Sequence, residues 1–264
     1  MRAIKPEVFL IAKTSDVDLT NYMKAIGNPD WNTDDNVSAA ENLVEAAGRM
    51  CYRSWEPFNT SKPDATNPNV SKVRRGNSAY MTHLLESGHH SCLEHASMTF
   101  VLHNVSRVVT HELVRHRAGM AYSQESLRYV RLTDIKAMIP DCFSSNKEAL
   151  DLFISTIEHL EFVQSQLAQI FKDDLAGSNF TRKKELTSAF RRLAPLGLAT
   201  AITFTANIRA LRHVIALRTS LGAEAEIRTV FLDVARIALA EYPNFFSDMS
   251  IDANGVCSFE SSGH

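Results

Sequence analysis

The sequence is poor in cysteine, and its few cysteines stand far apart. The 264 residues contain only Cys51, Cys92, Cys142 and Cys257, and no two of them form a CxxC pair. Thiolate zinc sites need short paired spacings, and disulfide frameworks need a denser set of cysteines. We therefore expect neither of these and a chain that resides in a reducing compartment.

Long apolar runs and long basic runs are also missing. No uninterrupted apolar stretch approaches the roughly 20 residues that span a bilayer, and residues 1–6 lack the apolar core of a signal peptide. The formal net charge is −2 without an extended lysine or arginine run, whereas general nucleic-acid binders carry a basic excess. These absences predict a cytoplasmic protein that uses neither membrane nor nucleic acid as a partner.

What is present is the composition of a globular protein, with 45% hydrophobic and 22% charged residues. Residue patterns predict strands at 7–14 and 98–102, with a turn and then extended chain over 122–132. Helical spacing predicts helices at 37–52 (with Ser38 as N-cap), 78–88, 105–117, 146–173, 182–194, 207–220 and 223–241. The stretch 53–75 is a polar loop, 201–205 a short apolar connection and the tail after 242 irregular. We expect one α+β domain over 1–264.

A first group of basic residues ends the predicted helix 105–117. His116 falls on its apolar stripe, while Arg115 and Arg117 flank it. Such residues can simply complement the negative end of a helix dipole. In the following stretch, if it is extended, Ser126 and Arg128 point to the same face. A hydroxyl beside a guanidinium suits a phosphate, although a solvated strand face explains the spacing equally well.

A second group lies on the predicted helix 207–220. Arg209, Arg212 and His213 share a face at spacings of three and four, and Arg218 lies on an apolar stripe. A guanidinium on an apolar stripe is costly unless an anion or several acceptors meet it. Arg218 is therefore a candidate for stabilising negative charge on a substrate. The alternative is an ion pair with a glutamate at 224 or 226.

Two stretches suggest metal binding but fit it poorly. His111 and Glu112 begin a zincin-like HExxH motif, but Arg115 occupies the place of the second histidine. The loop 88–95 contains His, Cys and Glu without a second cluster at metal-ligand spacing. We expect no metal site.

Taken in order, these stretches resemble the flavin-dependent thymidylate synthases. The family signature is RHR followed by spaced serines and an arginine, which this chain matches with Arg115-His116-Arg117, Ser123, Ser126 and Arg128. The resemblance continues through residues 94–100, 191–195, 207–209, His213, Arg218 and 225–227, and so spans about residues 80–130 and 186–230. The segment between Arg117 and Ser123 is one residue longer than the family pattern, and Glu112 stands where some members carry glutamine.

The resemblance implies a mixed sheet packed with several helices in a single domain, assembled as a homotetramer with shared active sites. By resemblance, the residues that contact FAD are Ser97, Arg115, His116, Arg117, Asn207, Arg209 and His213, with His95 in the flavin and folate region. Those that line the dUMP site are Glu112, Arg115, Gln124, Ser126, Arg128 and Arg191, and Arg218 corresponds to the arginine that activates the substrate.

The implied reaction is the methylation of dUMP to dTMP. Its carbon donor is 5,10-methylenetetrahydrofolate, FAD and NADPH supply the reducing equivalents, and no cysteine acts as nucleophile. Two other functions stay open on the residues alone. One is a non-catalytic nucleotide- or phosphate-binding protein whose arginines only bind anions, and the other is a metal-dependent hydrolase that uses the loop 89–95.

Overall fold

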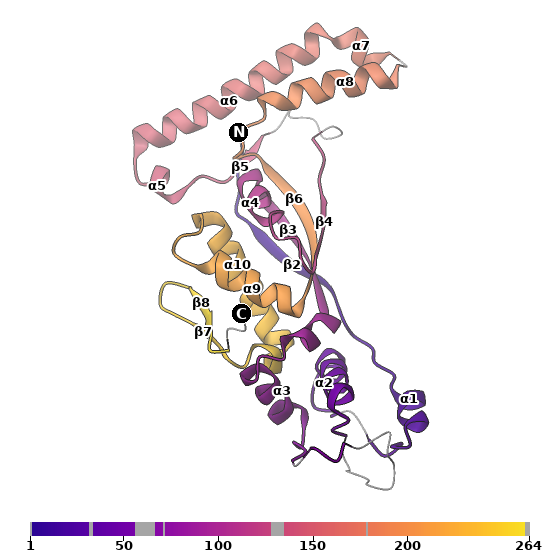
Figure 1. Cartoon of the computed structure of the whole chain (residues 1–264). Coiled ribbons are helices and arrows are strands. Elements are labelled where there is room, and N and C mark those ends of the chain that lie inside the picture. The colour runs from indigo at the N-terminus through magenta and orange to yellow at the C-terminus, as the bar shows by residue number, and fades with distance from the viewer. Residues whose placement is uncertain are drawn as a thin grey trace. The chain divides into compact units, whose positions relative to one another are not determined.

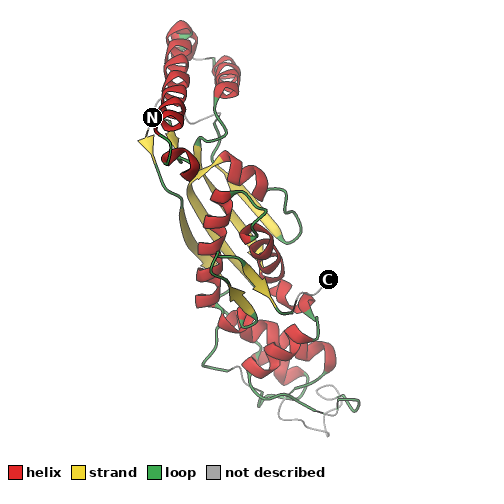
Figure 2. Cartoon of the chain, turned by 90° about the vertical axis from the view of Figure 1, so that its left-hand side faces the viewer, coloured by secondary structure: helices red, strands yellow, loops and turns green. Residues whose placement is uncertain are grey.

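The computed structural model describes residues 2–31, 34–55, 67–70, 72–127, 135–177 and 179–261. Within these ranges the chain combines helices with three small sheets, as expected for an α+β fold (Figures 1 and 2). None of the helices in these ranges has the length and hydropathy needed to cross a membrane.

The central sheet has four strands in the order β2-β3-β6-β4. These strands are β2 (Glu7–Lys13), β3 (Ser97–Ser106), β6 (Ala199–Asn207) and β4 (Met120–Gln124). In β6 every second residue is buried, among them Ile202, Phe204 and Ala206. This period of two is the pattern of a strand with one face in the core.

Contacts at both ends of the strands show that neighbours in this sheet run antiparallel. The Arg107 amide donates to the Leu198 carbonyl where β3 ends and β6 begins, and the Ile208 amide donates to the Ala96 carbonyl at the opposite end. The pairs β2–β3 and β6–β4 show the same reversal. The smaller sheets are parallel β1 (Arg2–Ala3) with β5 (Lys136–Ala137) and antiparallel β7 (Met249–Ile251) with β8 (Cys257–Phe259).

The chain divides into two compact units, which are described separately. Unit 1 comprises residues 1–9, 101–116 and 122–204, and unit 2 comprises residues 10–100, 117–121 and 205–264. Strands β2, β3, β4 and β6 each contribute residues to both units.

Unit 1 contains α4 (Arg107–Leu113), α5 (Asp141–Ser144), α6 (Lys147–Ile170), α7 (Lys172–Ala176), α8 (Phe180–Phe190) and η2 (Arg191–Leu193). Helices α6 and α8 lie side by side (Figure 1), and the buried Gln164 amide donates to the Phe190 carbonyl at 2.8 Å. An apolar cluster in unit 1 is formed by Ile135, Ile157 and Leu198.

Unit 2 contains α1 (Thr20–Ala25), α2 (Ala39–Tyr52), α3 (Asn77–Glu86), η1 (His90–His95), α9 (Ile208–Thr219), α10 (Ala225–Glu241) and η3 (Pro243–Phe246). Helix α9 packs on α10 and η1, and η1 packs on α2. Trp31 and Trp55 meet edge to face within a cluster with Met23 and Ala46. The predicted N-cap is confirmed, because Ser38 and Glu41 form a capping box at the start of α2.

Two strands pass directly into helices, and both junctions are capped by a side chain. Ser106 ends β3 and accepts the Val109 amide as N-cap of α4, while Asn207 ends β6 and accepts the Ala210 amide as N-cap of α9. Serine and asparagine favour this position because their oxygens satisfy unpaired helix amides. These junctions set where the two groups of basic residues begin.

Three sequence expectations are wrong. The helix expected over 105–117 covers only Arg107–Leu113: it begins after the Ser106 cap at which strand β3 ends, and it ends at Leu113, so that His116 lies beyond it. The stretch 201–205 belongs to strand β6, whose alternating small residues give a weak signal. The tail after 242 contains η3 and the β7–β8 hairpin, which turns at Gly255 with a φ of 77°.

Candidate active site

The residues assigned to the site are distributed over both units. Unit 1 holds Glu112, Arg115, Gln124, Ser126 and Arg191 of the nucleotide set, together with His116 of the flavin set. Unit 2 holds most of the flavin set and the candidate catalytic arginine: His95, Ser97, Arg117, Asn207, Arg209, His213 and Arg218. Arg128 lies outside the described residues.

In unit 1, side-chain hydrogen bonds tie β4 to α4. The Gln124 amide donates to the Thr110 hydroxyl at 2.9 Å. The Tyr122 hydroxyl lies 2.6 Å from the His116 carbonyl oxygen and 3.0 Å from that of Leu113. The Tyr122 side chain on β4 therefore fixes the turn that follows α4. In this turn Arg115 is exposed and His116 is half-buried.

Arg107 is a basic residue that the sequence analysis missed. Its Nη2 donates to the Glu125 carbonyl at 3.1 Å, but its Nε is buried without a hydrogen-bond partner among the described residues. Burial lowers the pKa of Arg107, and the positive charge of Arg191 lowers it further, although Glu125 opposes this. Because arginine stays protonated in proteins, two neighbouring guanidiniums favour an anion beside them. Its position directly after the Ser106 cap was a signal, since helix dipoles disfavour cations there.

In unit 2, Gly119 and Asn207 hold the start of β4 against the start of α9. The Asn207 amide donates to the Gly119 carbonyl at 2.9 Å. Gly119 has a φ of 68°, and a Cβ built there would lie 2.5 Å from Asn207 Nδ2. Only glycine combines this conformation with this close approach. Asn207 is thus primarily the N-cap of α9, and Gly119 is a second residue that the sequence analysis did not identify.

Helix α9 carries Arg209 and His213 one turn apart, and both are exposed. Arg209 Nη1 lies 2.7 Å from Glu94 Oε1, which ties the helix to η1 beside the exposed His95. Arg218 lies in the last turn and is half-buried. This one helix therefore places three of the predicted site residues within a single rigid element.

Arg212 does not share the surroundings of Arg209 and His213, although the spacing predicted one common face for the three residues. Arg212 is only 5% exposed, and its two terminal nitrogens contact Asp248 at 2.7 and 2.8 Å. A carboxylate that accepts both bonds compensates the burial of the guanidinium. Its partner stands 36 residues further along the chain, so the local spacing of α9 could not reveal it.

Ser97 lies at the start of β3, where its backbone pairs with Thr14. The Ser97 amide donates to the Thr14 hydroxyl, and the Thr14 amide donates to the Ser97 carbonyl, both at 3.1 Å. The Ser97 backbone is therefore fixed by strand pairing, and its side chain is half-buried.

The histidine-rich loop is partly structural. His90 is buried with Nε2 3.2 Å from the Leu85 carbonyl oxygen, and burial lowers its pKa. Over the described ranges, no three His, Cys, Asp or Glu side chains gather in a way that would hold a metal ion.

Comparison with known proteins identifies the family. The family model described as thymidylate synthase complementing protein matches residues 35–244. A flavin-dependent thymidylate synthase of Mycolicibacterium gilvum is 38% identical over 256 residues, which cover 96% of this chain and 94% of the relative. One from Corynebacterium diphtheriae is 34% identical and covers 83% of this chain and 82% of the relative.

The fold has a solved counterpart. A UMP/dUMP methylase from Streptomyces cacaoi, in a crystal structure with 5-Br dUMP, aligns with a TM-score of 0.63 over 94% of this chain and 96% of that chain. At 18% identity this likeness shows the fold alone. The family match spans most of the chain and includes every residue assigned to the site, from His95 to Arg218. The chain belongs to the flavin-dependent thymidylate synthases.

Proposed function

We propose that this chain methylates dUMP to dTMP, with 5,10-methylenetetrahydrofolate as carbon donor and with FAD and NADPH as the source of reducing equivalents. The observation that carries the proposal is the match to flavin-dependent thymidylate synthases over almost the whole chain. The same match makes a purely nucleotide-binding role the less favoured reading.

The residues of unit 2 fit a flavin dinucleotide. Its pyrophosphate is anionic, and the exposed Arg117, Arg209 and His213 supply positively charged or hydrogen-bonding groups. The N-terminus of the 12-residue helix α9 favours an anion as well. Gly119 makes room for the Asn207 side chain that caps this helix start. When bound, FAD supplies the hydride chemistry, and the protein binds and orients the reactants.

The residues of unit 1 suit the nucleotide. Arg115 and Arg191 are exposed cations, and Gln124 is held by Thr110 in a fixed orientation. Guanidinium groups bind phosphate through paired hydrogen bonds, so we assign the dUMP phosphate to these arginines together with Arg128. Glu112 and Ser126 would then contact the nucleoside.

Arg218 is the residue that we assign to substrate activation. A half-buried, permanently charged guanidinium stabilises negative charge that develops on the uracil ring as its imide ionises. Cys92 and Cys257 do not suit a nucleophilic role, because burial raises the pKa of both thiols.

We further propose that the two units act as one domain, since all four strands of the central sheet contribute to both, and that four chains assemble with shared active sites. Leu152, Phe162 and Ile170 on α6 are 68%, 57% and 72% exposed, and a neighbouring subunit would cover such apolar groups. The four free thiols suit a cytoplasmic location.

The deciding experiment measures dTMP formed from dUMP by the purified protein, with FAD, NADPH or methylenetetrahydrofolate omitted in turn. We expect a yellow protein whose product formation requires all three. A colourless protein that binds dUMP and forms no dTMP after reconstitution with FAD would support the nucleotide-binding alternative instead.

A further inference from the structure

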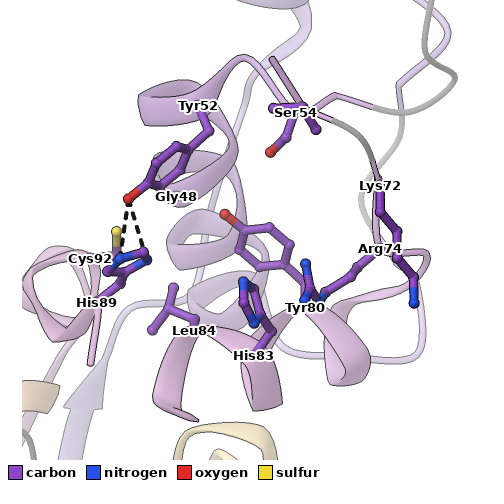
Figure 3. Close-up of a pocket in the computed structure, with 11 residues that line it drawn as sticks. Gly48, Tyr52, Ser54, Lys72, Arg74, Tyr80, His83, Leu84, His89 and Cys92 are labelled. Atoms are coloured by element: carbon purple, nitrogen blue, oxygen red, sulfur yellow. Dashed lines mark hydrogen bonds between the residues drawn. The ribbon is translucent and has the colours of Figure 1, made fainter. Parts of the chain in front are cut away.

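A small pocket lies within unit 2, apart from the residues assigned above to flavin and nucleotide. It is enclosed by the end of α2, by α3 and η1, and by residues of the loop that follows α2 (Figure 3). Its volume is about 180 Å³. A cavity of roughly 150 Å³ holds benzene, so this pocket accepts one six-membered ring with a small substituent and is too small for a flavin.

Aromatic side chains form two of its walls. The Tyr52 and His89 rings stack with centroids 5.4 Å apart, and the Tyr52 hydroxyl lies 3.2 Å from His89 Nε2. Across the pocket, the Tyr80 ring lies against the buried guanidinium of Arg49 at 4.6 Å. Flat apolar walls of this kind bind a ring by stacking or edge contacts.

The Tyr80 hydroxyl is a hydrogen-bond donor directed toward Gly48. A Cβ at Gly48 would lie only 2.5 Å from this oxygen, so the glycine makes room for it. Tyr80 is 8% exposed, and it lines the pocket. A hydroxyl at a pocket wall can donate a hydrogen bond to an acceptor on a ligand.

Cations line the other side of the pocket. Lys72 and Arg74 lie beyond Tyr80 when viewed from the Tyr52–His89 pair (Figure 3), and no carboxylate among the described residues pairs with either. The Arg74 backbone is fixed, because its carbonyl accepts Arg49 Nη2 at 2.8 Å. Burial lowers the pKa of His83, the charges of Arg74 and His89 lower it further, and Glu86 opposes them. The wall is therefore electropositive.

We propose that this pocket binds an aromatic ring that bears a carboxylate. The ring contacts Tyr52 and Tyr80, an acceptor on the ligand takes the Tyr80 hydrogen bond, and the carboxylate lies against Lys72 and Arg74. Two kinds of ligand carry such a ring and carboxylate: a free aryl acid, and the aminobenzoyl-glutamate portion of a folate. Only the second source rests on the proposed function.

The test is calorimetric titration of the full-length, flavin-loaded protein with 4-aminobenzoate and with 4-aminobenzoyl-glutamate. The double variant Lys72→Ala/Arg74→Gln removes one exposed and one half-buried cation, which should weaken binding about tenfold. Tyr80→Phe keeps the ring and should weaken it about three- to tenfold without a change in melting temperature. The matched control Lys172→Ala, an exposed lysine on α7, should bind as the unaltered protein does.

Kinetics separate the two sources. If 4-aminobenzoyl-glutamate competes with methylenetetrahydrofolate but not with dUMP, and Lys72→Ala/Arg74→Gln raises only the KM for folate, the pocket holds the folate tail. If the probes bind without competing, the ligand is a free aryl acid. Binding that persists in a chain unable to make dTMP overturns the proposed function alone. Failure of both probes to bind at millimolar concentration, or equal binding by all variants, overturns the pocket proposal.

Discussion

Arg212 on α9 and Asp248, which follows η3, form a two-bonded ion pair that fastens the C-terminal hairpin to the helix carrying Arg209, His213 and Arg218. The same guanidinium donates to the Phe245 carbonyl and lies 4.2 Å from the Phe259 ring centroid, and the Ser261 hydroxyl donates to Asp248. Residues 245–261 lie beyond the segment that the family model matches. The hairpin therefore supports the position of α9 from outside that segment.

We expect Asp248→Ala to lower the free energy of unfolding by about 3 kcal/mol or more, because it leaves Arg212 buried without its carboxylate. Chemical denaturation measures the loss, and flavin affinity should fall with it because α9 is released. Asp233→Ala, which removes the exposed partner of Arg236 on α10, is the control and should cost at most about 1 kcal/mol. Equal losses in the two variants would contradict the role of the pair.

The same pair predicts a dependence on acid. Burial by itself would raise the pKa of Asp248, but hydrogen bonds from Arg212 and Ser261 and the charge of Arg212 outweigh it, so the pKa is lowered. A carboxyl with a lowered pKa stabilises the fold above its unfolded value near pH 4, and this stability is lost as the pH falls through the folded value. Asp248→Asn should therefore lose less stability than the unaltered chain below about pH 4. Parallel stability curves for the two proteins would exclude this contribution.

Gly119→Ala should destabilise the junction between β4 and α9. The substitution places a methyl group 2.5 Å from Asn207 Nδ2 and puts alanine at a φ of 68°, which costs about 1–3 kcal/mol. Gly222→Ala is the matched control, since nothing lies within 4 Å of its Cβ position. Thermal unfolding and flavin titration should both separate the two variants. A Gly119→Ala protein that melts and binds flavin as the control does would refute the close approach.

Arg107→Gln tests the guanidinium that sequence analysis overlooked. If the dUMP phosphate lies between Arg107 and Arg191, loss of one charge-assisted hydrogen bond worth about 1.5–3 kcal/mol should raise the KM for dUMP roughly 10- to 100-fold. The rate at saturating dUMP and the flavin absorbance should stay unchanged. Arg236→Gln provides an exposed arginine as control. An unchanged KM in Arg107→Gln would assign this residue to the fold alone.

The sequence predicted elements well where a period and a cap coincided. Helices α2, α6 and α9 begin within two residues of expectation because Ser38, Asn146 and Asn207 cap apolar-periodic runs. The prediction of elements failed where an element depends on a neighbour that is distant in the sequence. Strand β6 is defined by β3 and β4 beside it, since its small alternating residues carry little periodic signal.

The candidate site followed the same rule. The motif located its basic residues, but not which of them are buried. Arg212 faces inward because Asp248 arrives from the C-terminal hairpin, and Arg107 is enclosed because its Nη2 meets the Glu125 carbonyl after β4. Neither partner lies within the local window that a helical or extended pattern samples, so burial and charge pairing at these two positions could be known only from the fold.

Arg218 provides the most direct test of the proposed chemistry. Arg218→Ala removes a half-buried positive charge near the end of α9, and losing such transition-state stabilisation costs about 3 kcal/mol, or roughly a hundredfold in kcat. Arg218→Lys keeps the charge and should retain more of the rate. The flavin spectrum should be unchanged in both variants, because the part of α9 that we assign to flavin is its start, whereas Arg218 lies in its last turn. Single-turnover measurement of dTMP with saturating dUMP isolates the chemical step from binding. Near-normal turnover in Arg218→Ala would remove this residue from the mechanism, and loss of flavin in both variants would reassign it to cofactor binding.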